Sequence, residues 1–403
     1  MFNRVTSSTG SARLLLLCSC ALLGACQSAD AQRYERKVID EQMAGGYGLS
    51  VADIDGDGRL DIVALATTPA QFVWYRNPTW EKFQITSGST GNIASAPYDI
   101  DGDGDIDLAL ASEFNLRAST EGGRVQWFEN PGNPQENQEW TAHDIDSIPT
   151  SHRLRWVDLV GNGKAVLVNL PIIGVGAVEP EYRGGAAMTA YQIPERPDGN
   201  WPSLVLNDAL EMAHGMAALD WNGDGREDVL TASFAGIELW QFAVDGYNVK
   251  KTLLGAGNRG ERPNQGSSEV GRGTLPGGVP FLASIEPWHG NEVVLYTPNA
   301  DGSLPWSRQV IDDTLVGGHA LVVADLNNDG VDEIVAGYRS RPFGLFTYRF
   351  QKDTGQWEKT ALDEGGIGVA GLAVADFSGD GYQDIAVIGT ATGNVVLFES
   401  GGR

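Results

Sequence analysis

The residues with the clearest chemical pattern are carboxylates in short loops that contain glycine. In DIDGDGRLD, acids occupy positions 1, 3, 5 and 9, and glycines at positions 4 and 6 let the chain curl inward. Hard oxygen ligands that converge in this way suit Ca²⁺, which takes about 6 to 8 oxygens. We expect five structural calcium sites, with the following ligands: Asp53, Asp55, Asp57 and Asp61; Asp99, Asp101, Asp103 and Asp107; Asp220, Asn222, Asp224 and Asp228; Asp325, Asn327, Asp329 and Glu333; and Asp376, Ser378, Asp380 and Asp384.

Two further segments share the layout of these loops but lose the acids. The segment from Arg153 has Val160 and Val166 where ligands should stand, and the segment from Arg272 keeps only a glycine turn between two apolar runs. We expect no metal in the first of them. The competing interpretation, that all these loops are ordinary polar turns, predicts scattered Asn and Asp without a fixed register.

A second group consists of imidazoles at a constant distance from the acids. His152, His214 and His319 each stand six residues before the first acid of a repeat, and Tyr47 takes that place in the first repeat. His289 follows the second strand of a repeat, in IEPWHGN. Two charged residues end the second strands of neighbouring repeats. The candidate catalytic residues are therefore His289, His319, His152, His214, Tyr47, Arg339 and Glu286.

These side chains allow three interpretations. Single histidines often only satisfy strand ends. Imidazoles from several strands can instead bind Zn²⁺ or another divalent ion. A third interpretation is an acid–base centre in which His and Tyr exchange protons and Arg339 holds negative charge. The last two are compatible, and four of five histidines in related registers favour them over the first.

A repeated β unit must position both groups. Each repeat predicts a strand, a tight loop and a second strand. An aromatic residue then opens an alternating segment after every copy, as in WEKFQIT and WSRQVID, with Tyr247 in this role in the fourth set. Another aromatic series marks the strand between them. Seven sets of four strands result, so the fold class is all-β.

The first alternating segment indicates how the chain closes. YERKVID, from Tyr34, matches WSRQVID although no repeat precedes it, while residues 394–399 supply only a third strand for the last repeat. The missing fourth strand must therefore be Tyr34 to Asp40. The prediction is a seven-bladed β-propeller over residues 34–403, with an N-terminal strand that closes the last blade.

Composition excludes several classes. The chain has 403 residues, with 28 Lys and Arg against 53 Asp and Glu, for a net charge of −25. Phosphate backbones would repel such a protein, so we expect no nucleic-acid partner. An apolar fraction of 42% is enough for a large core, which argues against disorder.

The N-terminus has the features of a targeting signal. Residues 1–25 combine arginines, an apolar run and the sequence LGA before Cys26, which resembles a bacterial lipoprotein signal peptide. We expect a lipid anchor on Cys26, a tether over residues 26–33, and a location in the bacterial cell envelope. Ordinary secretion is the alternative. The other two cysteines lie in the removed part, so no disulfide is expected.

The repeats resemble the FG-GAP or VCBS repeats of integrin-type propellers. That resemblance implies structural Ca²⁺ in loops that join the two innermost strands on one face, called the bottom. The histidines would then lie at the opposite face, the top, around the central channel.

A second resemblance concerns residues 268–348. The segments IEPWHGNEVVLYTP and VGGHALVVADLNNDGVDEIVAGYR look like the propeller portion of aldos-2-ulose dehydratases. The resemblance implies loss of water from a keto sugar: a base removes a proton beside a carbonyl, and a metal or cation stabilises the enolate. The cupin domains of that family do not follow here, so we do not expect its second, isomerising step.

The functional hypothesis is a monomeric carbon–oxygen lyase that acts on a keto sugar or glycoside. His289 or His319 would be the base, and a divalent ion on other histidines, or Arg339, would stabilise the enolate. The alternative is a non-catalytic, calcium-stabilised propeller that binds carbohydrate or protein. A third hypothesis, glycoside hydrolysis, would need Glu113 and Glu286 to lie as a pair.

Overall fold

The computed structural model of the chain describes residues 33–136, 139–243 and 249–402. The expected signal peptide, the lipidation site Cys26 and most of the tether 26–33 lie outside the described residues, as does Tyr247. Among the described residues, no helix is long and apolar enough to span a membrane.

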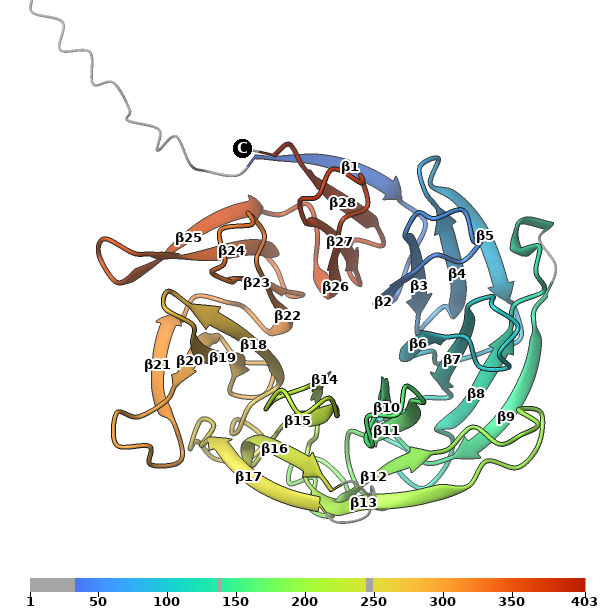
Figure 1. Cartoon of the computed structure of the whole chain (residues 1–403), viewed down its shortest axis with the longest axis horizontal. Helices are drawn as coiled ribbons and strands as arrows, with labels where there is room; N and C mark the ends of the chain where they lie inside the picture. Colours follow the sequence, from blue (N-terminus) through green and yellow to red (C-terminus); the bar gives the residue numbers. More distant parts are fainter. Residues whose placement is uncertain (1–32, 137–138, 244–248, 403) are drawn as a thin grey trace, which may run out of the picture.

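Seven four-stranded antiparallel sheets form a ring around a central channel (Figure 1). The first four blades, from the innermost strand outward, are β2 (Gly46–Ala52), β3 (Asp61–Ala66), β4 (Gln71–Arg76) and β5 (Glu81–Thr86); β6 (Ala94–Tyr98), β7 (Asp107–Ser112), β8 (Arg124–Glu129) and β9 (Thr141–Ser147); β10 (Ser151–Val157), β11 (Val166–Pro171), β12 (Ala186–Tyr191) and β13 (Ser203–Leu210); and β14 (Gly215–Leu219), β15 (Asp228–Ser233), β16 (Gly236–Phe242) and β17 (Val249–Gly255).

The remaining blades complete the ring. They are β18 (Glu269–Leu275), β19 (Val279–Glu286), β20 (Glu292–Thr297) and β21 (Ser307–Asp312); β22 (Gly318–Ala324), β23 (Glu333–Tyr338), β24 (Gly344–Gln351) and β25 (Gln356–Asp363); and β26 (Val369–Ala375), β27 (Asp384–Gly389), β28 (Val395–Ser400) and β1 (Tyr34–Asp40). A short 3₁₀ helix, η1 (Pro134–Glu136), is the one helical element in the described residues. The all-β, seven-bladed architecture predicted from the repeats is confirmed.

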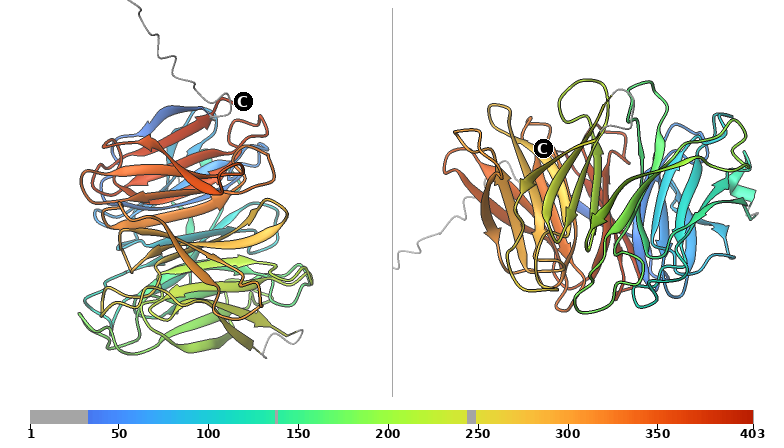
Figure 2. Two further views of the ribbon diagram at one scale, coloured as in Figure 1. Left: turned by 90° about the vertical axis from the view of Figure 1, so that its left-hand side faces the viewer. Right: turned by 90° about the horizontal axis from the view of Figure 1, so that it is seen from below.

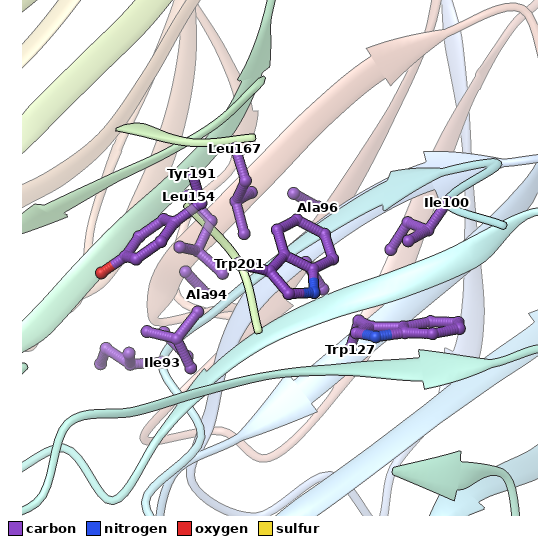
Figure 3. Packing of buried hydrophobic residues seen from close by; sticks show 12 residues of the cluster. Ile93, Ala94, Ala96, Ile100, Trp127, Leu154, Leu167, Tyr191 and Trp201 are labelled. Carbon is purple, nitrogen blue, oxygen red and sulfur yellow. The ribbon is translucent and has the colours of Figure 1, made fainter. Parts of the chain in front are cut away.

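The core lies between blades, which explains the strand patterns. The second strand of a blade has neighbouring blades on both faces, so β3 reads DIVALA with every residue buried. Outer strands alternate, because one face meets water. Figure 3 shows one such interface, where Trp127 of the second blade and Leu154 and Tyr191 of the third belong to one buried cluster.

The chain closes through β1, as the sequence predicts. β1 pairs antiparallel with β28, from Tyr34 opposite Ser400 to Asp40 opposite Val395. Lys37 and Glu399 add an ion pair at 2.6 Å. The two ends of the chain therefore build one blade, and Figure 1 shows β1 as the outer strand beside β28.

The two blades that lack an acid loop are each held by an acid from the next blade. The N–H of Asp158 donates to Glu227 Oε2 at 2.7 Å, and the N–H of Glu227 donates to the Asp158 carbonyl at 2.9 Å. Thr274 and Asp332 repeat this reciprocal pair at 2.7 and 3.0 Å.

Candidate active site

Four inner strands place aromatic or imidazole side chains at the same level of the channel. Tyr47, His152, His214 and His319 each stand five residues before the last residue of β2, β10, β14 and β22 respectively. The acid loops follow the opposite ends of the inner strands. Because the strands run between the two faces of the ring (Figure 2), the imidazoles and the acids lie at opposite faces. His289 joins the imidazoles from the connection that follows β19.

Three histidines form the centre of this cluster. The ring centroids of His214, His289 and His319 lie 4.7 to 5.3 Å apart. One nitrogen from each ring falls within 4.8 Å of the other two, which is close enough for a common metal ion. His152 packs against His214 at 4.8 Å. The sequence placed these four histidines at one face, and the structure brings them into contact.

The hydrogen bonds of His214 and His319 prepare both rings for metal. His319 Nδ1 lies 2.6 Å from the Ala370 carbonyl, and His214 Nδ1 lies 3.0 Å from both the Ser268 carbonyl and Glu269 Oε1. These partners only accept, so the proton is on Nδ1 and Nε2 carries the lone pair, which in His214 faces His289 Nε2 at 3.0 Å. His319 Nε2 is buried and has no hydrogen-bond partner within the described structure. Metal-binding histidines are commonly oriented by such carbonyls and carboxylates, so this pair fits a divalent ion.

His289 differs from these two rings. Its Nδ1 faces Arg339 Nη2 at 3.2 Å, and since a guanidinium only donates, Nδ1 is an acceptor. Its Nε2 faces His214 Nε2 at 3.0 Å. His289 is also half-buried, whereas His152, His214 and His319 are at most 1% exposed. The neutral ring therefore carries its proton on Nε2, so His289 can accept a further proton at Nδ1 once Arg339 moves away, and its access to water suits that role.

Burial keeps the cluster neutral. Desolvation lowers the pKa of His152, His289 and His319 well below the ordinary value, and nearby guanidinium and imidazole groups lower it further. The pKa of His214 is also lowered by burial, although Glu269 opposes the shift. Neutral imidazole is the form that binds metal or accepts a proton.

Two residues that sequence reasoning missed connect these histidines. Arg153 donates to Glu269 Oε1 at 2.8 Å and lies 3.1 Å from His152 Nε2, which also faces the Tyr47 hydroxyl at 2.8 Å. Burial raises the pKa of Glu269, but Arg153 and His214 outweigh it, so the net pKa is lowered and the group is ionised. A signal existed: Glu269 opens β18, at the end where other inner strands carry histidine.

Two expectations about glutamate residues were wrong. Glu286 lies apart from the cluster, because its carboxylate accepts from Ser267 Oγ at 2.6 Å, Tyr296 OH at 2.8 Å and Arg308 Nε at 2.9 Å. Glu113 is exposed while Glu286 is fully buried, so they do not form the pair that glycoside hydrolysis requires.

The Trp288 indole stacks on His289, with centroids 4.4 Å apart and planes 27° from parallel. It also makes edge-to-face contacts with Tyr182 and Phe234. Trp288 therefore orients the half-buried histidine.

The acid loops at the other face fit the predicted calcium chemistry. Three carboxylates converge within 4.8 Å at Asp53, Asp55 and Asp57, and likewise in the second loop. The position-nine acid has a further role that the sequence did not indicate. Asp61 is fully buried, and its two oxygens accept the N–H groups of Ile54 and Asn77 at 2.9 and 2.8 Å. It ties the loop to its blade.

Comparison with known proteins agrees with this architecture. Residues 122–301 match the family model described as the aldos-2-ulose dehydratase β-propeller domain, and residues 53–110 match the FG-GAP-like repeat. The chain is a repeat propeller related to the dehydratase propeller. Aldos-2-ulose dehydratase from Phanerodontia chrysosporium is 28% identical over 378 residues, which cover 85% of this chain and 40% of the relative. The chain therefore spans less than half of that protein.

A solved structure titled as BBS1N in complex with ARL6DN shares the fold. It has a TM-score of 0.50 at 10% identity and covers 92% of this chain and 96% of its own. The dehydratase-propeller match contains His152, His214, His289, Arg153 and Glu269, and the FG-GAP match contains the first two acid loops. The related region thus includes most of the imidazole cluster.

Calcium removal should destabilise this dehydratase-related propeller most at alkaline pH. Burial raises the pKa of Asp61, Asp107 and Glu333 to about 7 in the metal-free protein. A raised carboxyl pKa contributes stability below the unfolded value of about 4, and that contribution is lost as pH rises through about 7. Protons thus partly replace calcium at low pH.

We expect excess EGTA to lower the melting temperature by about 5 °C or more at pH 8. The difference between calcium-loaded and chelated samples should shrink at pH 5.5. Thermal melts at both pH values measure it. An unchanged melt in excess chelator at pH 8 would contradict the calcium assignment.

Proposed function

We propose that this protein is a carbohydrate lyase that eliminates water from a keto sugar or glycoside at the histidine face of the channel. The observation that carries the proposal is the buried, unpartnered Nε2 of His319 beside His214 and His289. Kinship with the propeller of a dehydratase supplies the reaction class. The signal-like N-terminus supports action outside the cytoplasm.

The first step is proton transfer from carbon to Nδ1 of His289, which becomes free when Arg339 turns from it to the substrate oxygen. Its imidazole is neutral, half-buried and held by Arg339 and Trp288. Loss of the proton beside the carbonyl leaves negative charge on the carbonyl oxygen as an enolate. A divalent ion on His214 and His319 would supply Lewis-acid stabilisation of that oxygen.

Arg339 can share this charge stabilisation. Its guanidinium contacts His289, and no ion pair in the described residues contains Arg339, so its positive charge is not already neutralised. Burial lowers its pKa from the ordinary value, with Tyr47 opposing. The group stays protonated at neutral pH.

The second step breaks the carbon–oxygen bond at the β position. Electrons of the enolate form the new double bond, and hydroxide leaves as water after it takes a proton. Tyr47 would supply that proton from its hydroxyl, which lies 2.8 Å from His152 Nε2, and water would reprotonate the tyrosine after the product leaves.

A calcium-stabilised binding propeller without catalysis is the second candidate. The observation that favours it is the size of the channel cavity, about 130 Å³, against about 300 Å³ or more for most small-molecule pockets. In that function, carbohydrate or protein would bind at the rim and the imidazole cluster would be structural.

Ultraviolet absorbance separates the two candidates. The purified protein is incubated with 1,5-anhydrofructose and with 3-keto-glycosides, with and without zinc. The lyase should produce an enone, which absorbs ultraviolet light more strongly than the substrate does, and zinc should increase the rate of enone formation. Absence of signal with every keto sugar, together with unchanged ligand binding in the His289→Ala and His319→Ala variants, would favour the binding function.

A further inference from the structure

The central channel has a charge opposite to that of the protein. The chain has a net charge of −25, yet the channel cavity is lined by Arg153 and Arg155 with Glu269 as the acid among its lining residues. His319 and Tyr47 also line this cavity. One carboxylate therefore faces two guanidinium groups.

Arg153 and Arg155 share one face of β10 because they are two residues apart on a strand. Their partners differ. Arg153 is neutralised by Glu269 at 2.8 Å. Arg155 Nη1 donates to the Leu154 carbonyl at 2.7 Å, and none of the ion pairs in the described residues includes Arg155.

The Arg155 side chain is solvent-exposed within the structure and lines the channel cavity. Desolvation and the neighbouring Arg153 together lower the pKa of Arg155 to about 10, although Glu269 opposes the shift. The group still carries a proton at neutral pH, so its charge persists. Two guanidinium groups and one carboxylate line the cavity, so positive charge is in excess there and attracts an anion.

We propose that Arg155, assisted by Arg153, binds a small oxyanion in the central channel behind the histidine cluster. The planar guanidinium forms two parallel hydrogen bonds to a carboxylate, phosphate or sulfate group. A cavity of about 130 Å³ is large enough for one such group together with water. The site does not depend on the proposed elimination reaction.

The oxyanion can be a free inorganic ion or the carboxylate of a sugar acid. Calorimetric titrations with sodium sulfate and with sodium glucuronate distinguish these sources, and neutral glucose is the control ligand. We expect saturable binding of at least one anion with one site per chain, and no comparable heat from glucose.

The test variant is Arg155→Met, which removes the guanidinium and keeps an unbranched side chain. Anion binding should weaken at least about tenfold, because a hydrogen bond to a charged group is lost. Arg124→Met is the matched control, since Arg124 pairs with Asp144 on an exposed part of the second blade. It should leave binding unchanged.

Arg155→Lys keeps the charge without the planar fork, and should bind with intermediate affinity. It also tests the site if the methionine variant does not fold, which melts of each variant will establish. The proposal is overturned if neither anion binds wild-type protein saturably. Equal affinities in wild type and in both Arg155 variants would overturn it as well.

Discussion

Replacing His319 with alanine is expected to abolish metal binding at the histidine face and to remove the elimination activity. His319 Nε2 is buried and has no hydrogen-bond partner among the described residues, and its Nδ1–H is fixed by the Ala370 carbonyl at 2.6 Å. Loss of one of two prepared ligands should weaken zinc binding by about 100-fold or more, because ring orientation alone is worth about 10- to 100-fold.

Enone formation should fall by about a thousandfold or more, since a Lewis acid contributes several kcal/mol at a developing oxyanion. Zinc is measured by competition with a chromophoric chelator, and activity by absorbance. His143→Ala is the control, because His143 stacks on Trp127 and pairs with Glu129 away from the cluster. A His319→Ala protein that keeps zinc and activity would refute this role.

Removal of the closing strand should have the largest effect on stability. A chain that begins at Gln42 lacks β1, whose six residue pairs join β28. At about 1 kcal/mol for each hydrogen bond, the loss is roughly 5 kcal/mol, comparable with the total stability of many proteins. The exposed edge of β28 should also promote aggregation.

We expect the shortened protein to melt at least 10 °C lower or to aggregate, as measured by circular dichroism and light scattering. A peptide of residues 33–41 added in excess should restore much of the loss, because it can pair with β28 in the native register. A shortened protein with the full-length melt and no response to peptide would show that the ring does not need this strand.

Sequence reasoning found the features that depend on local, repeated patterns. The acid registers, the aromatic series and the unmatched first strand recur at nearly constant spacing, and they led to seven blades closed by β1. The constant spacing of His152, His214 and His319 from the acids also predicted a common face. Residues at the same position of each repeat lie at the same level of the ring, so the spacing of residues along the chain was sufficient for these predictions.

The spacing of the repeats did not predict which partner a side chain binds where several neighbouring groups can pair with it. Glu286 and Arg339 end the second strands of adjacent blades, and the sequence treated them as equivalent. The fifth blade supplies Tyr296 and Arg308, which bind the Glu286 carboxylate, whereas Arg339 turns to His289. Charge pairing within one blade thus decided the direction of a side chain.

By itself, the sequence determined how many blades form, where the chain closes and which face carries the imidazoles, because these follow from a regular repeat. Only the tertiary structure decided which groups meet in the channel. Arg153 comes from the third blade and Glu269 from the fifth, and none of the ion pairs among the described residues contains Arg155. Such contacts depend on ring closure, which brings together strands more than 100 residues apart.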